Sequence, residues 1–222
     1  MIGWVSLEGA NGVGKSHLGR LAAASLGEVC VPLVELPDSP PAGLPGRVIA
    51  ALHADGDRFL RTGHPRTETL LLAALQVHRY ESMPPVAAGQ MVLEDRGPAS
   101  VAVYQAAVLA EADNAADSWA LRQAVAIERT IEVWRPLPTT TVLLSDAPDV
   151  CLARFEQRTG QASSNDERAL MARVHRVYHL LAADRPEHYL LLDRRTLGED
   201  EAVEFITRAC RAAAAHVEGV TE

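Results

Sequence analysis

A glycine-rich segment close to the start of the chain has residue types and a spacing that could bind phosphate. Residues 9–16 read G-A-N-G-V-G-K-S, which fits the pattern G-x-x-x-x-G-K-[ST] at every position. Such glycines let the backbone curl with its N–H groups pointing inward, and the next helix adds its positive end. Lys15 would reach the β- and γ-phosphates of ATP, and the Ser16 hydroxyl would bind Mg²⁺. A glycine-rich turn with an incidental lysine is disfavoured, because the segment lies between an apolar strand and an amphipathic helix.

A second group of chemically useful residues follows a later apolar run. Residues 90–94 are predicted as a strand, and the charged residues Glu94, Asp95 and Arg96 lie at its end. In an open parallel sheet, ligands bind beyond the carboxyl ends of the strands. Asp95 is therefore placed to steady Mg²⁺ or the attacking group, and Arg96 to hold an incoming phosphate. A surface turn with a local ion pair explains the two residues equally well.

The elements that must position these residues alternate between strands and helices. We predict strands at 2–7, 29–36, 90–94, 139–145 and 189–192. We predict helices at 16–26, 47–53, 67–88, 99–112, 118–134, 150–158, 167–183 and 199–216, with a kink or break at Pro84-Pro85. Residues 37–45 carry four prolines and are predicted as a loop. The alternation predicts an α/β fold: one three-layer P-loop NTPase domain over residues 1–222, with a parallel sheet of about five strands flanked by helices.

The composition argues against several classes of partner. A formal net charge of −8 disfavours nucleic acids and anionic membranes, because binding to them needs a basic excess. No secretory signal is evident, and no apolar stretch reaches the roughly 20 residues needed to span a bilayer. The three cysteines, Cys30, Cys151 and Cys210, are far apart, which predicts reduced thiols rather than disulfides or a zinc site. We therefore expect a cytoplasmic protein with no nucleic-acid or membrane partner.

Four blocks of the sequence, in the right order, resemble the thymidylate kinases, a family of nucleoside monophosphate kinases. The first is residues 6–16, where a Glu-Gly pair opens the glycine-rich loop. The second, R-T-E-T-L-L-L-A-A at 66–74, is similar to the family's R-T-E-x-L-L-F-A-A. The third is Asp95-Arg96 followed by Ser100 and Tyr104-Gln105. The fourth, within residues 140–160, looks like the strand, helix and arginine-bearing lid that close over ATP.

The resemblance implies a role for individual residues, with ATP and Mg²⁺ as cofactors, a nucleotide as the small-molecule substrate and a lid at about 154–168. Arg47 and Arg96 would grip the acceptor's monophosphate, and Tyr104 would screen the 2′-position of its sugar. Arg154 and Arg158 would stabilise charge during phosphoryl transfer, although a place on a helix surface explains either one nearly as well. The candidate catalytic residues are Lys15, Asp95, Arg96 and Arg158; those for ATP are Gly9, Asn11, Gly12, Gly14, Lys15, Ser16, His17 and Arg154; those for the acceptor are Glu35, Arg47, Leu72, Gln76, Arg96, Ser100, Tyr104 and Gln105; and those for the metal are Ser16 and Asp95.

The departures from the family pattern lie mainly on the acceptor side. Leu72 stands where the family has a phenylalanine that stacks on thymine, and Gln76 where it has an arginine that bonds the base. Leucine has no π-face, and glutamine is a neutral donor and acceptor. Asn11 replaces a common aspartate, and Gly97 replaces a tyrosine. We therefore expect a changed acceptor: a modified pyrimidine nucleotide, another nucleotide or a nucleoside.

Two other functions remain open at this stage. A nucleoside kinase that acts on a 5′-hydroxyl would need a carboxylate base near the end of the third strand, and Glu94 or Asp95 could serve. A nucleotide-binding regulator without turnover is disfavoured by the presence of Lys15, Ser16, Asp95 and Arg96 together. Residues 101–109 could form a homodimer face or belong to the core.

Overall fold

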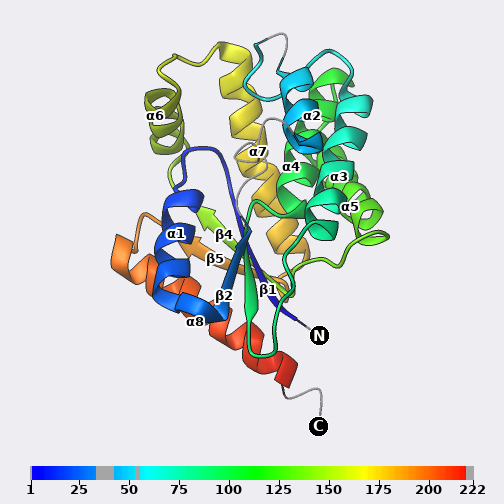
Figure 1. Ribbon diagram of the computed structural model, residues 1–222. Coiled ribbons are helices and arrows are strands. Elements are labelled where there is room, and N and C mark those ends of the chain that lie inside the picture. The colour runs from blue at the N-terminus through cyan, green and yellow to red at the C-terminus, as the bar shows by residue number, and fades with distance from the viewer. Residues whose placement is uncertain (1, 34–42, 54–55, 219–222) are drawn as a thin grey trace.

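The computed structural model describes residues 2–33, 43–53 and 56–218. Its centre is one sheet of five parallel strands in the order β2-β3-β1-β4-β5 (Figure 1). The strands are β1 (Gly3–Glu8), β2 (Cys30–Leu33), β3 (Met91–Asp95), β4 (Thr140–Ser145) and β5 (Tyr189–Asp193). The predicted α/β fold with a five-stranded parallel sheet is confirmed.

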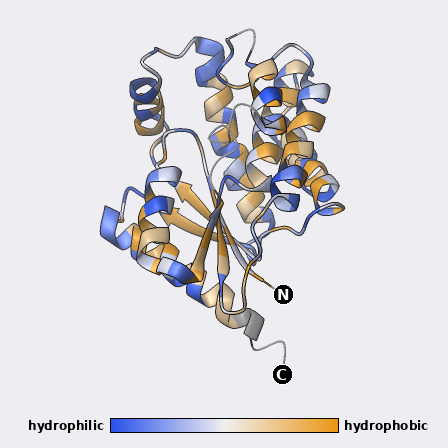
Figure 2. Ribbon diagram, viewed as in Figure 1, coloured by the Kyte–Doolittle hydropathy of each residue, from blue (hydrophilic) through white to orange (hydrophobic). Residues whose placement is uncertain are grey.

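Helices cover both faces of the sheet. They are α1 (Lys15–Leu26), α2 (Leu44–Leu52), α3 (Pro65–Glu81), α4 (Pro98–Ala112), α5 (Asp117–Glu132), α6 (Pro148–Thr159), α7 (Asn165–Asp184) and α8 (Glu199–Glu218). Helices α1 and α8 pack on one face, and α3, α4, α5 and α7 form a bundle over the other, while α6 rises beside α7 at the carboxyl end of the strands (Figure 1). The strands are apolar throughout much of their length, whereas α1, α6 and α8 each carry a polar side (Figure 2).

Two predicted elements need correction. The helix predicted over 67–88 ends at Glu81, where the N–H of Ser82 still bonds the carbonyl of His78, and residues 82–88 are not helical. Pro84 and Pro85 follow, and proline has no N–H with which to continue a helix. The strand predicted over 29–36 is described only as β2, since Val29 lies in a short 3₁₀ turn and residues 34–36 lie outside the described part of the chain.

The two faces of β1 differ in polarity, and this difference prepares the site. Val5 and Leu7 belong to the apolar cluster shared with α1 and α8. Ser6 and Glu8 alternate with them and are buried on the side of α4 and α7, where the Ser6 hydroxyl lies 3.3 Å from that of Thr141. Because successive side chains of a strand point to opposite faces, one face of the sheet is apolar and the other carries polar groups.

Glu8 is a fully buried acid at the carboxyl end of β1. Its Oε2 accepts hydrogen bonds from the hydroxyls of Ser100 on α4 and Tyr178 on α7, and Oε1 has no partner among the described residues. Burial raises the pKa of Glu8 to about 8, although the bond from Ser100 and the charge of Lys15 oppose the shift. The Glu8 carboxyl is therefore largely neutral at pH 7.

Glu94, one residue before the end of β3, is also fully buried but is bound by cations. Arg135 donates to both of its carboxylate oxygens at 3.0 Å, and Arg79 approaches Oε1 at 3.2 Å. The Trp4 indole donates to Oε2 at 3.0 Å, and the Arg135 guanidinium lies 4.7 Å from the Trp4 ring centroid. An unpaired buried carboxylate would cost several kcal/mol, so these partners are a condition of the fold.

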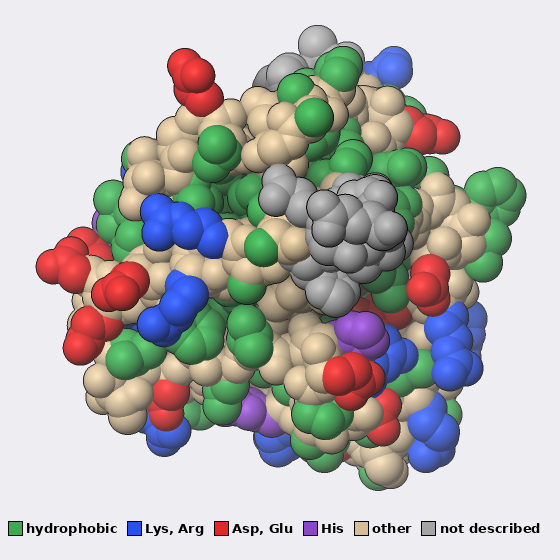
Figure 3. All heavy atoms as spheres, turned by 90° about the horizontal axis from the view of Figure 1, so that it is seen from below, with side chains coloured by type: hydrophobic (Ala, Val, Ile, Leu, Met, Phe, Trp, Pro, Cys, Tyr) green, Lys and Arg blue, Asp and Glu red, His purple; other side chains and the backbone are tan. Residues whose placement is uncertain are grey.

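The face of the molecule seen from below carries charges of both signs (Figure 3). Seen from below, acidic and basic side chains lie among apolar ones (Figure 3). Among the described residues, no helix is both long and apolar enough to cross a membrane.

We predict that Glu8 makes the stability of the fold depend on pH. Because the folded state raises its pKa from 4.5 to about 8, the contribution of Glu8 is complete below pH 4.5 and is lost as the pH rises towards 8. The loss is at most about 1.4 kcal/mol for each pH unit in this window. Glu8→Gln keeps the shape without the charge and should flatten the profile, measured as the free energy of urea unfolding between pH 5 and 8. Parallel profiles for the two proteins would contradict this assignment.

Candidate functional site

The glycine-rich loop joins β1 to α1 at the carboxyl edge of the sheet. Gly9 and Gly12 have φ angles of 137° and 81°, in the region that favours glycine. A Cβ on Gly9 would lie 2.4 Å from the carbonyl oxygen of Leu144, and one on Gly12 would lie 2.0 Å from that of Cys151. The loop is therefore pressed against β4 and α6, and its glycines are sterically required. Gly14 is the N-cap of α1, so the loop leads into the positive end of that helix.

Lys15, Ser16 and His17 form the first turn of α1 but differ in surroundings. The Lys15 ammonium is buried and donates to the carbonyl oxygens of Gly9 and Ala10 at 2.7 and 3.0 Å, so it is held over the loop. The ring of exposed His17 lies 2.7 Å from Glu199 on α8. The His17 side chain thus points away from the loop, and only its backbone N–H is placed to meet a phosphate.

Asp95 ends β3 directly beside β1, where it is the register partner of Leu7. Its Oδ1 atom is buried and has no hydrogen-bond partner in the described part of the chain. Mg²⁺ is usually held by one or two protein oxygens together with phosphates and water, so this buried oxygen and the Ser16 hydroxyl fit such an ion. Among the described residues, no three His, Cys, Asp or Glu side chains gather into a metal cage made by the protein alone.

A cavity lies beside the glycine-rich loop, between α2, α3 and α4. It is lined by six of the eight acceptor candidates from the sequence, together with residues from α2 and from the segment 57–61. The lining residues are Asn11, Ile49, His53, Arg58, Phe59, Leu60, Leu72, Gln76, Arg96, Ser100, Val101, Tyr104 and Gln105. The predicted acceptor residues among them are Leu72, Gln76, Arg96, Ser100, Tyr104 and Gln105. Asn11, which was predicted to contact ATP, thus also lines this cavity.

Arg96 connects the cavity with the glycine-rich loop. Its guanidinium donates to the side-chain oxygen of Asn11 and lies 5.6 Å from the centroid of the Tyr104 ring. The Tyr104 hydroxyl in turn accepts a 2.8 Å bond from the backbone N–H of Asn11. A cation is therefore presented between the loop and the cavity, where a phosphate on an acceptor would have to lie to meet ATP.

Gln76 lines the cavity, and its amide is engaged by other groups of the protein. Its side-chain oxygen accepts a 3.1 Å bond from Arg135, and its nitrogen faces the carbonyls of Arg96 and Gly97 at 3.5 Å. Both ends of the amide are thus directed to protein groups, while the Gln76 side chain is part of the cavity lining. Leu72, one turn earlier on α3, offers the cavity an apolar surface.

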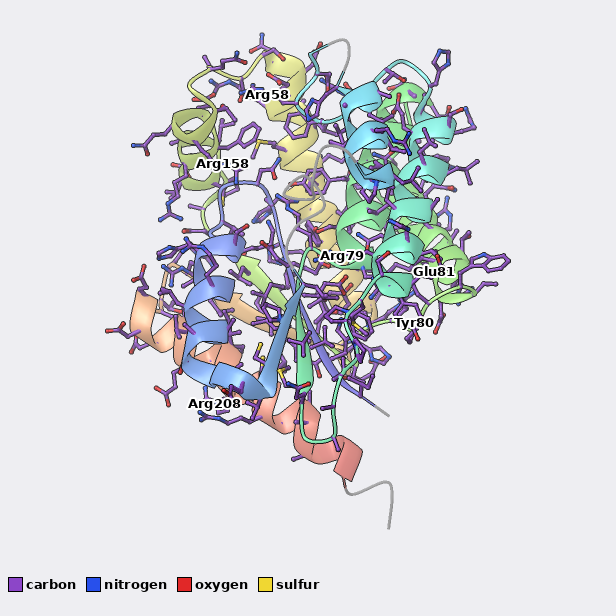
Figure 4. The ribbon with its side chains drawn as sticks, viewed as in Figure 1. Arg58, Arg79, Tyr80, Glu81, Arg158 and Arg208 are labelled. Atoms are coloured by element: carbon purple, nitrogen blue, oxygen red, sulfur yellow. The ribbon has the colours of Figure 1, made fainter. Side chains whose placement is uncertain are left out.

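The predicted lid corresponds to the end of α6, the segment 160–164 and the start of α7. Arg154 is half-exposed and donates to Asp146 at 2.8 Å, while Arg158 is exposed and lies 5.7 Å from the Phe155 ring centroid. The Arg154 guanidinium is therefore engaged by an acid, whereas that of Arg158 lies near an aromatic ring. Figure 4 shows Arg158 on α6, on the side of the molecule above the glycine-rich loop.

Arg58 holds this lid from the opposite side of the cavity. It donates to Glu167 at 2.6 and 2.9 Å, to the Thr159 hydroxyl at 2.9 Å and to the Gln161 carbonyl at 3.1 Å. Its guanidinium also lies 4.9 Å from the Phe155 ring centroid. Figure 4 places Arg58 at the upper end of α7, so one side chain ties the segment before α3 to both lid helices.

Arg47 and Glu35, the two remaining acceptor candidates, are not among the described residues that line the cavity. Arg47 is on the exposed side of α2 and does not line the cavity. Glu35 lies outside the described residues.

Sequence reasoning missed three arginines that shape this site: Arg58, Arg79 and Arg135. Each contacts site residues at least 15 positions away in the chain, and none lies in a recognisable motif. The only available signal was indirect, since a buried acid such as Glu94 at a strand end requires a cation from somewhere in the chain.

Comparisons with known proteins agree with this geometry. The family model described as thymidylate kinase matches residues 7–206. A thymidylate kinase from Clavibacter michiganensis subsp. michiganensis is 31% identical over 217 residues, which cover 93% of each chain.

Solved structures show the same fold at lower identity. The thymidylate kinase of Ehrlichia chaffeensis has a TM-score of 0.63 at 15% identity, covering 93% of this chain and 97% of its own. The deoxyadenosine kinase of M. mycoides, solved with bound dCTP, also has a TM-score of 0.63, at 10% identity, covering 94% and 98%. These two likenesses support the P-loop kinase fold, and the family match extends over most of the chain. With its loop, its cavity and its sequence in agreement, the chain belongs to the thymidylate kinase family.

Proposed function

We propose that this nucleotide kinase transfers the γ-phosphoryl group of ATP to a (deoxy)nucleoside monophosphate with a pyrimidine or modified pyrimidine base. The observation that carries the proposal is the junction at Asn11. There the glycine-rich loop, which suits a nucleoside triphosphate, adjoins a cavity that is lined by the Arg96 guanidinium. A donor in the loop and an acceptor in the cavity would meet end to end, as in-line transfer requires.

The chain's own residues have distinct parts in this reaction. Lys15 and the loop N–H groups would hold the β- and γ-phosphates, and Arg96 would hold the acceptor phosphate beside them. Mg²⁺, held by Ser16 and Asp95, would neutralise charge on the transferred group. The lid, residues 154–168, would bring Arg158 over the phosphates and exclude water.

A nucleoside acceptor is less well supported, because it would need a free carboxylate base. Glu94, one of the two candidates for that base, is fully buried and bound by Arg135, Arg79 and Trp4. Asp95 is left, and the same carboxylate is the one that suits Mg²⁺. A monophosphate acceptor requires no such base and makes use of Arg96.

The orientation of the Gln105 amide favours an acceptor whose base presents an N–H group to it. The Thr69 hydroxyl lies 2.7 Å from the Pro65 carbonyl oxygen and 3.1 Å from the atom placed as Oε1 of Gln105. A hydroxyl has one hydrogen, and the shorter contact with the carbonyl uses it. We therefore infer that the Gln105 amide is turned so that its nitrogen donates to Thr69 and its carbonyl faces the cavity. That carbonyl can accept from the N3–H of a thymine or uracil ring, or from an amino group.

The first test is transfer itself. We expect the purified protein with ATP and Mg²⁺ to add one phosphate to a member of a panel of deoxynucleoside and nucleoside monophosphates, detected by mass spectrometry. Lys15→Ala should lower this rate at least about 100-fold, because the ammonium on the transferred phosphate is lost. Product from nucleosides alone would overturn the proposed acceptor, and absence of any transfer by the wild type would leave a nucleotide-binding regulator.

The second prediction concerns lid closure through Arg58. Arg58→Ala removes its hydrogen bonds to Glu167, Thr159 and Gln161, so the lid should open more often. We expect kcat to fall, hydrolysis of ATP relative to transfer to increase, and trypsin to cleave faster after Arg158. Arg61→Ala is the matched control, because Arg61 comes from the same segment but pairs with Asp57 and Glu111 instead of the lid. Equal behaviour of the two variants would show that Arg58 is not specific to the lid.

The third prediction concerns the residue that departs from the family pattern. Gln76→Arg would place a second guanidinium against Arg135 and remove the side-chain oxygen that accepts a hydrogen bond from Arg135. The substitution should therefore lower the free energy of urea unfolding by roughly 2–4 kcal/mol. Restoring the family's arginine therefore needs the double change Gln76→Arg with Arg135→Gln, which should recover part of the loss. If Gln76→Arg alone were as stable as the wild type, the pairing of Gln76 with Arg135 would have no energetic weight.

A further inference from the structure

Arg96 has an unusual backbone conformation. Its φ angle is 60°, in the left-handed region that residues with a side chain rarely adopt. Such a conformation is strained for a residue with a side chain, so the surrounding structure must hold it in place. Leu7 contributes by accepting a 3.2 Å bond from the Arg96 N–H. The larger contribution comes from the carbonyl side.

Arg79, on the last turns of α3, binds the backbone on both sides of this strained position. Its guanidinium donates to the carbonyl oxygen of Arg96 at 2.8 Å and to that of Asp95 at 3.0 Å. It also donates to the Leu33 carbonyl at the end of β2 and lies 3.2 Å from Glu94. Figure 4 shows Arg79 near the centre of the molecule, at the carboxyl ends of the strands. One buried side chain therefore joins the ends of two strands to α3.

The chemistry of these contacts requires arginine. Three carbonyl oxygens from two strand ends are reached by one planar fork with donors at fixed angles, whereas a lysine ammonium is a single point on a flexible stem. Glu94 keeps the charge of Arg79 compensated in a place where Arg79 is only 9% exposed. Bonds from a cation to carbonyls are also stronger than neutral ones.

The conformation of Arg96 decides where its guanidinium lies. From the left-handed backbone, the side chain reaches Asn11 in the glycine-rich loop and covers the Tyr104 ring. With a relaxed, negative φ the Cα–Cβ bond would point in another direction, and the guanidinium would leave the junction between loop and cavity.

We propose that Arg79 is a positioning residue that holds the Arg96 backbone in the left-handed conformation and so aims the Arg96 guanidinium at the phosphate of the acceptor. The last step rests on the proposed function, whereas the control of the Arg96 backbone by Arg79 does not. Arg79 is not among the residues that line the cavity.

The first experiment compares crystal structures of the wild type and Arg79→Lys, which keeps the charge beside Glu94 but loses the fork. We expect Arg96 to leave the positive φ region, or its guanidinium to leave Asn11. Arg79→Gln is the second variant if Arg79→Lys folds poorly, and thermal unfolding verifies both. An unchanged φ and an unchanged contact with Asn11 in the variant would overturn the proposal, whatever the acceptor is.

The second experiment measures binding by calorimetry with three probes: dTMP, thymidine and ADP. We expect Arg79→Lys to weaken dTMP about ten-fold while thymidine and ADP change less than two-fold, because only dTMP presents a phosphate to Arg96. Arg66→Lys, an exposed change on the same helix, is the control and should alter none of the three affinities. Equal weakening of all three probes by Arg79→Lys would mean general damage and would overturn the proposal.

A double-mutant cycle then separates positioning from a direct role. In an Arg96→Ala background, Arg79→Lys should have no further effect on dTMP affinity, since Arg79 acts through Arg96. A persistent ten-fold loss in that background would overturn the proposal. If wild-type protein bound no monophosphate and phosphorylated none in the panel, the proposed function would fail, and the crystallographic comparison would still decide the role of Arg79.

Discussion

The burial of the Glu94 carboxylate is the constraint on which much of this structure depends. A charge without solvent contact at the end of β3 must be compensated, and the chain compensates it with Arg135 and Arg79. Arg135 comes from the connection after α5 and is itself fully buried against Trp4 and Tyr80. Arg79 comes from α3. Through Arg79, Glu94 thereby links α3, which forms one wall of the cavity, to the strand that ends at Asp95 just before Arg96.

The two halves of the site are built in different ways. The glycine-rich loop is local: eight consecutive residues, a strand before them and a helix after them contain nearly all its determinants, and Gly9 and Gly12 fit because β4 and α6 press against them. The cavity is non-local, with walls from α2, α3, α4 and the loop itself. Its shape depends on contacts between residues far apart in the chain, such as the bonds of Arg58 to the lid and of Arg135 to Gln76.

This difference explains what could be predicted from the sequence. The order of the strands in the sheet could not be predicted from the sequence. The strands, the parallel α/β fold and the phosphate loop could, because their signals are periodic or contiguous. Gln76 was interpreted as a contact to the base because of its position in a motif, and Arg135, which takes its side-chain oxygen, lies 59 residues away with no local signature. Arg79 was invisible for the same reason, since its importance comes from the carbonyls it meets and not from its neighbours in the sequence. His17 shows the converse, because its place in the motif did not reveal that its ring turns to Glu199.

The charge of the site also follows from how its two buried acids are treated. The whole chain has a formal net charge of −8, yet the ends of β1 and β3 must attract phosphates. Burial holds the pKa of Glu8 at about 8, so this carboxyl is largely neutral at pH 7 and does not cancel the nearby charges of Lys15 and Arg96. Glu94 is held by two arginines, Arg135 and Arg79, so its charge is compensated. Both acids are buried at the strand ends, where they shape the structure by hydrogen bonding. The cations Lys15 and Arg96 lie at the glycine-rich loop. An acidic protein can thus keep a local positive field at its carboxyl edge, because low-dielectric surroundings limit the screening there.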